Sequence, residues 1–200
     1  MNTAKRYDRF APFYEHGERI LEIYLSNKRS FLHQKIKENK ILEVGIGSGR
    51  TIHHYKAGTN LFAGDLSMGM MHYALRRSLS RAISINFSSF DVEQLPFKDS
   101  TFPAAVSSLV FCTVNSPLKG LKEIRRVLEP AGNLYMIEHV KPESRAAQIV
   151  FDALNLFSAS LIGDHLNRNT SKLVKDAGFC IVEEHRFFLG VFRILIALKE

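Results

Sequence analysis

KILEVGIGSG, residues 40–49, places a short apolar run directly before three glycines. The run Ile41–Val44 predicts a buried strand, and the glycines predict a tight turn at its end. Because Gly45, Gly47 and Gly49 lack Cβ atoms, the backbone there can bend sharply and a ligand can approach it closely. The spacing differs from the dinucleotide pattern G-x-G-x-x-G, since position 50 is an arginine, so an ordinary strand-to-helix turn is the alternative interpretation.

Two acidic residues frame this turn. Glu43 lies two residues before the first glycine, where its carboxylate favours a ligand with an amine or a positive charge and repels a phosphate. A second apolar run, Leu61–Gly64, ends in Asp65, which has the position of the strand-end acid that binds ribose hydroxyls in doubly wound nucleotide sites. The glycines and the two acids together predict a site for a nucleoside.

These residues resemble the class I S-adenosylmethionine-dependent methyltransferases. The family's first motif is matched by EVGIGSG, Glu43–Gly49, and its second-strand acid is matched by Asp65. The resemblance extends over roughly residues 5–198. It implies an α/β fold with a doubly wound, Rossmann-like sheet of seven strands, whose last strand is antiparallel and lies at the edge. It also implies S-adenosylmethionine as cofactor, S-adenosylhomocysteine as product and an N-terminal helical lid.

Length and composition agree with one enzyme-sized domain. The chain has 200 residues, of which 46% are hydrophobic and 24% charged, and no apolar run is long enough to span a membrane. Its start lacks the apolar core of a signal peptide, which predicts a cytoplasmic protein. The two cysteines have no histidine partners at metal-site spacing, so no metal is expected. The net charge of +7 admits nucleic acid, anionic lipid or an acidic small molecule as partner.

Residues 1–39 show helical periodicity and are predicted to form a lid in front of the methyltransferase domain at residues 40–200. This segment contains eight basic and five acidic side chains, which favours peripheral contact with the inner face of an anionic membrane. A helix packed on the fold with a charged outer face is the alternative. The stretch Tyr7–Glu15 resembles the family's lid, so Tyr7 and Tyr14 are predicted to close over the cofactor, and Tyr14 is also a catalytic candidate.

The segment after Asp65 is predicted to hold the cofactor as well. Crossover helices are predicted to begin at residues 50–55 and after Ser67, which has the character of an N-cap. Because Ser67 lies so close to the strand-end acid, Leu66 and Ser67 should flank the ribose and adenine. Met70, one turn into the second helix, is either an adenine contact or a core residue.

A further cofactor segment is DVEQLPF, residues 91–97. It resembles the D-x-E-x-L-P-F segment of small-molecule and lipid methyltransferases. That resemblance assigns Asp91 as the acceptor for the adenine amino group, with the backbone amide of the adjacent Val92 as a second contact on the adenine edge.

The segment after the predicted strand Ala104–Phe111 bears on the substrate class, because ligands of doubly wound sheets lie outside the carboxyl ends of the strands. Methyltransferases that act on nucleic-acid amines resemble one another in a D/N/S-P-P-Y/F sequence here. This chain has NSPL, Asn115–Leu118, without the second proline and the aromatic residue. We therefore expect no nucleic acid partner, and we expect the substrate to be a lipid or a lipophilic small molecule.

The C-terminal part supplies the predicted substrate residues. His139 follows the fifth predicted strand and is predicted to accept a proton from the substrate, with a hydrogen bond inside the loop as the alternative. An apolar segment, residues 145–162, is followed by Asp164, His165 and Arg168. This order predicts a lipid substrate whose tails lie on the apolar segment and whose phosphate binds Arg168. The alternative is that the apolar segment is buried in the fold and that the polar residues form a capped surface turn.

Within the family, the chain resembles bacterial phospholipid N-methyltransferases, which predicts stepwise methylation of phosphatidylethanolamine towards phosphatidylcholine. Quinone-ring C-methyltransferases share the L-P-F and R-V-L-x-P signatures, here Leu95–Phe97 and Arg126–Pro130, and are the second interpretation. Ala131 replaces a glycine that follows the second signature in the family. A third interpretation is a protein that binds S-adenosylmethionine without catalysis, because this chemistry requires no particular nucleophile that could be checked in the sequence.

Overall fold

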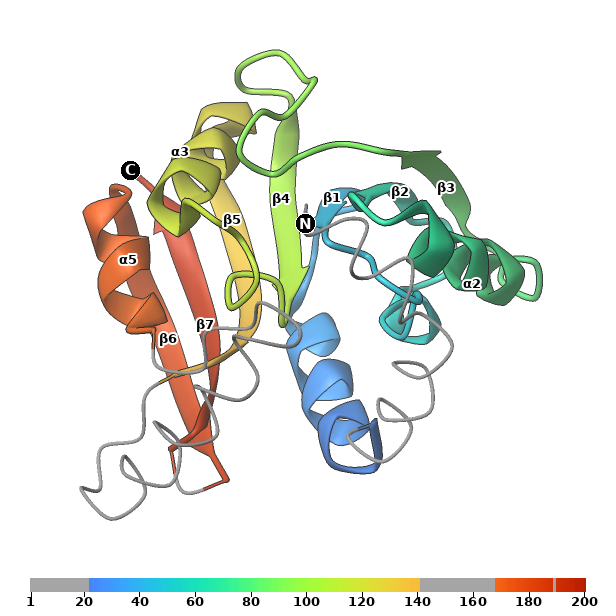
Figure 1. Cartoon of the computed structure of the whole chain (residues 1–200), viewed down its shortest axis with the longest axis horizontal. Coiled ribbons are helices and arrows are strands. Elements are labelled where there is room, and N and C mark those ends of the chain that lie inside the picture. The colour runs from blue at the N-terminus through green and yellow to red at the C-terminus, as the bar shows by residue number, and fades with distance from the viewer. Residues whose placement is uncertain (1–21, 141–167, 189) are drawn as a thin grey trace.

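The computed structural model describes residues 22–140, 168–188 and 190–200, whose helices and strands are shown in Figure 1. Residues 22–35 form the first described helix. Strands and helices then alternate over much of the chain, which is the pattern of an α/β domain. In chain order the elements are β1 (Lys40–Val44), the 3-10 turn η1 (Ile52–His54), β2 (Asn60–Gly64), α2 (Met68–Ser78), β3 (Ser84–Ser88), β4 (Phe102–Ser108), α3 (Pro117–Val127), β5 (Leu128–His139), α5 (Thr170–Asp176), β6 (Phe179–Phe187) and β7 (Phe192–Lys199).

In the described part of the chain, seven strands form one sheet in the order β3-β2-β1-β4-β5-β7-β6. The first five strands are parallel to one another, and β7 pairs antiparallel with both β5 and β6. The predicted doubly wound sheet with an antiparallel last strand is confirmed. The predicted edge position of that strand is wrong, because β7 lies between β5 and β6. Residues 193–197 of β7 are buried, as expected for a strand covered on both faces, whereas most of β6 is partly exposed.

Helices cover both faces of the sheet (Figure 1). On one face, α3 and α5 pack over alternate residues of the central strands, such as Leu42 and Ala105. On the other face, the helix over residues 22–35, η1 and α2 pack over the intervening residues, such as Ile41 and Val106. Residues 41–44 of β1 are all buried as a result, which fixes the side chain of Glu43 inside the fold.

Two predicted elements are shorter than the sequence pattern indicates. The helix predicted at residues 50–55 is only the 3-10 turn η1, because Tyr55 is extended and Gly58 turns the chain with a φ of +82°. The fourth strand ends at Ser108 instead of Phe111, because Leu109 adopts a left-handed backbone conformation with a φ of +59°. The early end of β4 leaves irregular backbone at the carboxyl end of the sheet, next to the glycines.

The helix over residues 22–35 shares the core of the sheet. Leu25 and Leu32 are buried among strand residues, while Ile23 and Tyr24 are exposed. The remaining part of the predicted lid, residues 1–21, lies outside the described residues, so the lid and its membrane contact stay predictions. Within the described ranges, no helix has the length and apolar character needed to cross a membrane.

Candidate active site

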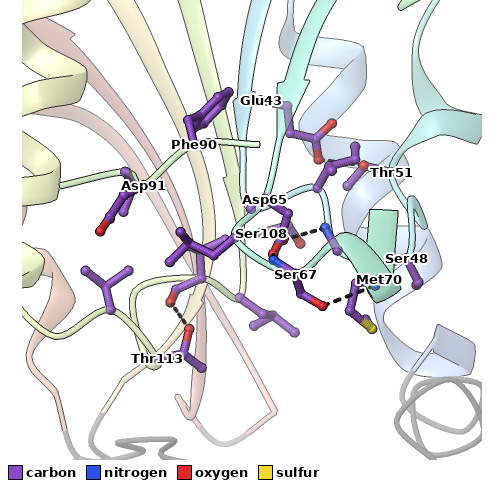
Figure 2. A pocket seen from close by; sticks show the side chains of 18 of the residues that line it. Glu43, Ser48, Thr51, Asp65, Ser67, Met70, Phe90, Asp91, Ser108 and Thr113 are labelled. Atoms are coloured by element: carbon purple, nitrogen blue, oxygen red, sulfur yellow. Dashed lines mark hydrogen bonds between the residues drawn. The ribbon is translucent and has the colours of Figure 1, made fainter. Parts of the chain in front are cut away.

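A pocket opens at the carboxyl ends of β1, β2 and β4, between the glycine loop, the start of α2 and the loop that follows β4 (Figure 2). Doubly wound sheets bind their ligands at this position, where the strand order reverses. The structure brings together most of the residues predicted to hold the cofactor. Those that line the pocket are Glu43, Gly45, Gly47, Asp65, Leu66, Ser67, Met70, Asp91 and Val92.

Asp65 joins the glycine loop to the start of α2. Its Oδ2 accepts a hydrogen bond from the Gly47 N–H at 2.9 Å, and its Oδ1 accepts one from the Ser67 N–H at 2.9 Å. Ser67 in turn caps α2, because its Oγ accepts from the Met70 N–H at 3.2 Å (Figure 2). The Asp65 carboxylate therefore has a fixed position in the pocket wall, where a ribose hydroxyl would meet a charged acceptor.

The three glycines of the loop have different roles. At Gly45 a Cβ atom would lie 2.3 Å from Cγ2 of Val110, so the loop after β4 rests directly on the glycine loop. Gly47 faces the pocket, and a Cβ there would come no closer than 3.8 Å to other atoms. At Gly49 a Cβ would lie 2.7 Å from Cα of Ala74. Gly49 does not line the pocket, so the structure assigns it to the packing of α2 instead of the predicted cofactor contact.

Glu43 lines the pocket from a buried position, with 1% of its surface exposed. Its Oε1 accepts from the Thr51 hydroxyl at 2.6 Å, and its Oε2 accepts from the Tyr55 hydroxyl at 2.9 Å. Burial raises the pKa of Glu43 to about 7, although the two hydroxyl donors act in the opposite direction. A positively charged ligand favours the ionised carboxylate, so binding of a cation is coupled to loss of a proton from Glu43.

Asp91 lies across the pocket from Asp65 (Figure 2). A tight turn holds it there, because its Oδ1 accepts from the Glu93 N–H at 2.8 Å and its carbonyl oxygen accepts from the Gln94 N–H at 3.0 Å. Met70 is only 3% exposed and also lines the pocket, which agrees with both of its predicted roles.

The buried Arg29 and the loop after β4 complete the pocket, and sequence reasoning did not single out Arg29. Arg29 is 4% exposed, its Nε donates to Ser108 Oγ at 3.3 Å, and its Nη1 pairs with Glu22. A signal was present in the sequence, because Leu25, Arg29 and Leu32 recur at helical spacing on one face. An arginine between two apolar residues of that face indicates a buried cation with a specific partner.

The predicted substrate residues are not brought together at the pocket. His139 ends β5, packs edge-on against Phe192 with ring centroids 5.1 Å apart, and does not line the pocket. Arg168 donates through Nη1 to the carbonyl oxygens of Phe111 and Val114, the latter at 2.6 Å, so the guanidinium is directed at the loop after β4. Its predicted phosphate contact stays a prediction. Four further predicted residues lie outside the described part of the chain: Tyr7, Tyr14, Asp164 and His165.

A doubly wound sheet with a glycine loop and strand-end acids at its switch point defines a nucleoside-binding α/β protein. Residues 42–136 match the family model described as a methyltransferase domain. The chain is 35% identical over 180 residues to the demethylmenaquinone methyltransferase of Clavibacter sepedonicus, which covers 80% of this chain and 73% of that relative. It is 28% identical over 172 residues to a thiol S-methyltransferase of Rattus norvegicus, at 80% and 70% coverage. An S-adenosylmethionine-dependent methyltransferase structure from Thermotoga maritima, 20% identical, superposes with a TM-score of 0.77 over 98% of this chain and 99% of that chain.

The chain therefore belongs to the class I S-adenosylmethionine-dependent methyltransferases, and it is an enzyme that uses S-adenosylmethionine as cofactor. The pocket fits this molecule, because it offers separate carboxylates for an amine, a ribose and an adenine amino group at Glu43, Asp65 and Asp91. These pairings of residues with cofactor atoms stay predictions. The bound cofactor supplies an already activated methyl group, so the protein's residues have to orient the acceptor and exclude water.

Proposed function

We propose that the enzyme methylates a lipophilic small molecule, and specifically a ring carbon of a quinol. The observation that carries this proposal is the similarity to a demethylmenaquinone methyltransferase over most of both chains. A quinol is a phenol, and loss of its phenolic proton increases the electron density on the ring carbons that accept the methyl group. The second interpretation of the sequence thus replaces phosphatidylethanolamine as the preferred acceptor, because the relatives above are named for a quinone and for thiols.

The guanidinium of Arg29 at the start of the loop after β4 supports an acceptor that reacts as an anion. The segment over residues 108–115, which forms the wall after β4, contains only neutral side chains. The buried Arg29 donates to Ser108 at the start of this wall and is paired with Glu22, while the carboxylate of Glu93 accepts from the Ser116 N–H just beyond its end. A guanidinium stabilises a phenolate and repels an ammonium group. Phosphatidylethanolamine would also have to lose a proton, and the base predicted for that step, His139, does not line the pocket.

A thiol is the second candidate acceptor, favoured by the similarity to a thiol S-methyltransferase over 80% of this chain. A thiolate is an anion and a strong nucleophile, so the same neutral wall and the same guanidinium suit it. The two candidates differ in the product, because one gains a carbon–carbon bond and the other a thioether.

The deciding experiment offers purified enzyme and labelled S-adenosylmethionine three acceptors in parallel mixed micelles: a demethylated menaquinol kept reduced, an alkyl thiol and phosphatidylethanolamine. We expect label in the quinol ring. Asp65→Ala serves as the cofactor-site control and should lower transfer to every acceptor. Transfer to the thiol alone would replace the quinol by the second candidate, and transfer to phosphatidylethanolamine alone would restore the first interpretation of the sequence.

Peripheral contact with the inner face of a membrane is part of the proposal, because quinols partition into bilayers. The net charge of +7 supports it, since basic residues near an anionic surface contribute about 1 kcal/mol each. Sedimentation with anionic vesicles should bring the enzyme down at low salt and release it at high salt. Equal sedimentation with neutral vesicles would remove the electrostatic part of this proposal.

A further inference from the structure

The loop that follows β4 is held from the side of β5 by a buried carboxylate. Glu138 is fully buried, and its Oε1 accepts from the N–H groups of Val110 at 3.0 Å and Phe111 at 3.1 Å. The same oxygen accepts from the Ser107 hydroxyl at 3.3 Å. Arg193 stands opposite Glu138 in the antiparallel pairing of β5 with β7, and its Nη1 is paired with Glu184 at 2.8 Å. Three donors from β4 and the loop after it therefore hold the buried carboxyl group of Glu138.

The same loop is held from the other side by a guanidinium. Arg168, two residues before α5, donates through Nη1 to the carbonyl oxygens of Phe111 and Val114. Phe111 is thus bound at both its N–H and its C=O, by side chains of opposite charge that come from distant parts of the chain. Neither Glu138 nor Arg168 lines the pocket, so neither would contact the cofactor or the acceptor in this arrangement.

The bound loop determines the shape of the acceptor side of the pocket. Val110 lies so close to the glycine loop that a Cβ at Gly45 would meet it at 2.3 Å, and Leu109 and Thr113 line the pocket on either side. Leu109 has a φ of +59°, a left-handed conformation that is unfavourable for a non-glycine residue. A strained turn of this kind persists only when surrounding contacts hold it.

We propose that Glu138 and Arg168 are positioning residues for the methyl acceptor. They act through Phe111 and its neighbours, by holding the loop over residues 109–115 at the distance from the glycine loop that aligns an acceptor with the methyl group. This inference rests on the methyl-transfer site and not on the identity of the acceptor. It assigns Arg168 to the backbone of this loop, in place of a lipid phosphate.

The first measurement needs no acceptor. Amide hydrogen exchange of Val110 and Phe111 should accelerate on the order of 10-fold or more in Glu138→Ala, because each amide loses a charged acceptor. Glu138→Gln keeps an oxygen at the same position and should stay near the wild-type rate. Exchange at these two amides that is unchanged in Glu138→Ala, or acceleration spread evenly over the sheet, would overturn the positioning role.

The second measurement separates the acceptor from the cofactor. Arg168→Ala should leave the calorimetric Kd for S-adenosylhomocysteine within about 3-fold of wild type and lower kcat/KM for the acceptor by about 10-fold or more, as expected for one or two lost charged hydrogen bonds. Arg168→Lys should recover part of the loss. The matched control is Arg125→Ala, because Arg125 also donates to two backbone carbonyls, of Gly178 at 3.0 Å and Glu200 at 2.8 Å, outside the pocket.

The outcomes distinguish this inference from the proposed function. Wild-type acceptor kinetics in Arg168→Ala would overturn the inference, and so would an equal loss in Arg125→Ala. A parallel loss of cofactor affinity would show a general structural role instead. If wild-type enzyme methylates none of the three acceptors, the proposed function fails, and the exchange measurement still decides the positioning role. If Glu138→Ala does not fold, exchange at Phe111 in Arg168→Ala provides the same test.

Discussion

Replacement of Glu43 by glutamine should change how stability depends on pH. Burial raises the pKa of Glu43 to about 7 in the folded protein, against an ordinary value of 4.5. Between these two values the folded state keeps a proton that the unfolded state has released. The contribution of Glu43 to the free energy of unfolding should therefore fall as the pH rises from about 4.5 to 7, and Glu43 should add no further change above that range.

The size of the effect follows from the same two values. At about 1.4 kcal/mol per pH unit, the difference between about 7 and 4.5 corresponds to about 3 kcal/mol. Glutamine does not titrate and can still accept from the hydroxyl of Thr51 and bond to that of Tyr55, so Glu43→Gln should lack this loss. Relative to wild type, the variant should therefore gain about 3 kcal/mol between pH 4.5 and pH 8.

Urea unfolding at pH 4.5, 6 and 8, without cofactor, measures this difference. The control is Glu183→Gln, because Lys35 and His185 lower the pKa of Glu183. The ionised Glu183 stabilises the folded protein above its ordinary pKa, so this variant should lose stability relative to wild type as the pH rises, opposite to Glu43→Gln. Parallel pH profiles for wild type and Glu43→Gln, within about 0.5 kcal/mol, would refute the reasoning, since the buried carboxyl would then titrate alike in the folded and unfolded chain.

Three further changes test the site and the fold. Asp65→Ala should weaken S-adenosylmethionine binding by about 1–3 kcal/mol in calorimetry, because a charged acceptor is lost; an unchanged Kd in the folded variant would remove Asp65 from the ligand. Gly49→Ala should destabilise the protein by about 2 kcal/mol or more in urea, since its φ is +81° and the new Cβ would meet Ala74. Ala131→Gly should stabilise by about 0.5–1 kcal/mol, because Ala131 has a φ of +59°; no gain would mean that this turn carries little strain.

The cofactor side of the pocket could be predicted from the sequence because it depends on local rules. A strand that ends in glycines can be recognised from a short segment, and so can an acidic residue directly after a strand. Glu43, Asp65 and Asp91 are each predicted from such short segments, and all three line the pocket. Gly49 shows the limit of this reasoning. The motif assigns all three glycines to the ligand, but only the packed structure shows that one of them makes room for α2.

The acceptor side could not be predicted in the same way, because its residues are defined by contacts between distant segments. Arg29 becomes a pocket residue only when its helix packs on the sheet beside Ser108, and Arg168 reaches Phe111 across 57 positions of the chain. The positions of β6 and β7 in the sheet could not be predicted either, because the order of strands along the chain does not determine their order in the sheet. The only sign of the interior position of β7 in the sequence is its largely apolar character.

The insertion of β7 also has a consequence for the synthesis of the protein. β6 leaves the ribosome before β7, yet in the described sheet it pairs with β7 alone. Until residues 192–199 have been translated, β5 and β6 both present open backbone edges, which invite association with other chains. A premature stop before Phe192 would therefore remove β7, leave β6 without a partner strand and leave one edge of β5 open. Completion of the sheet thus depends on translation through these residues, which makes shortened chains targets for chaperones and proteases.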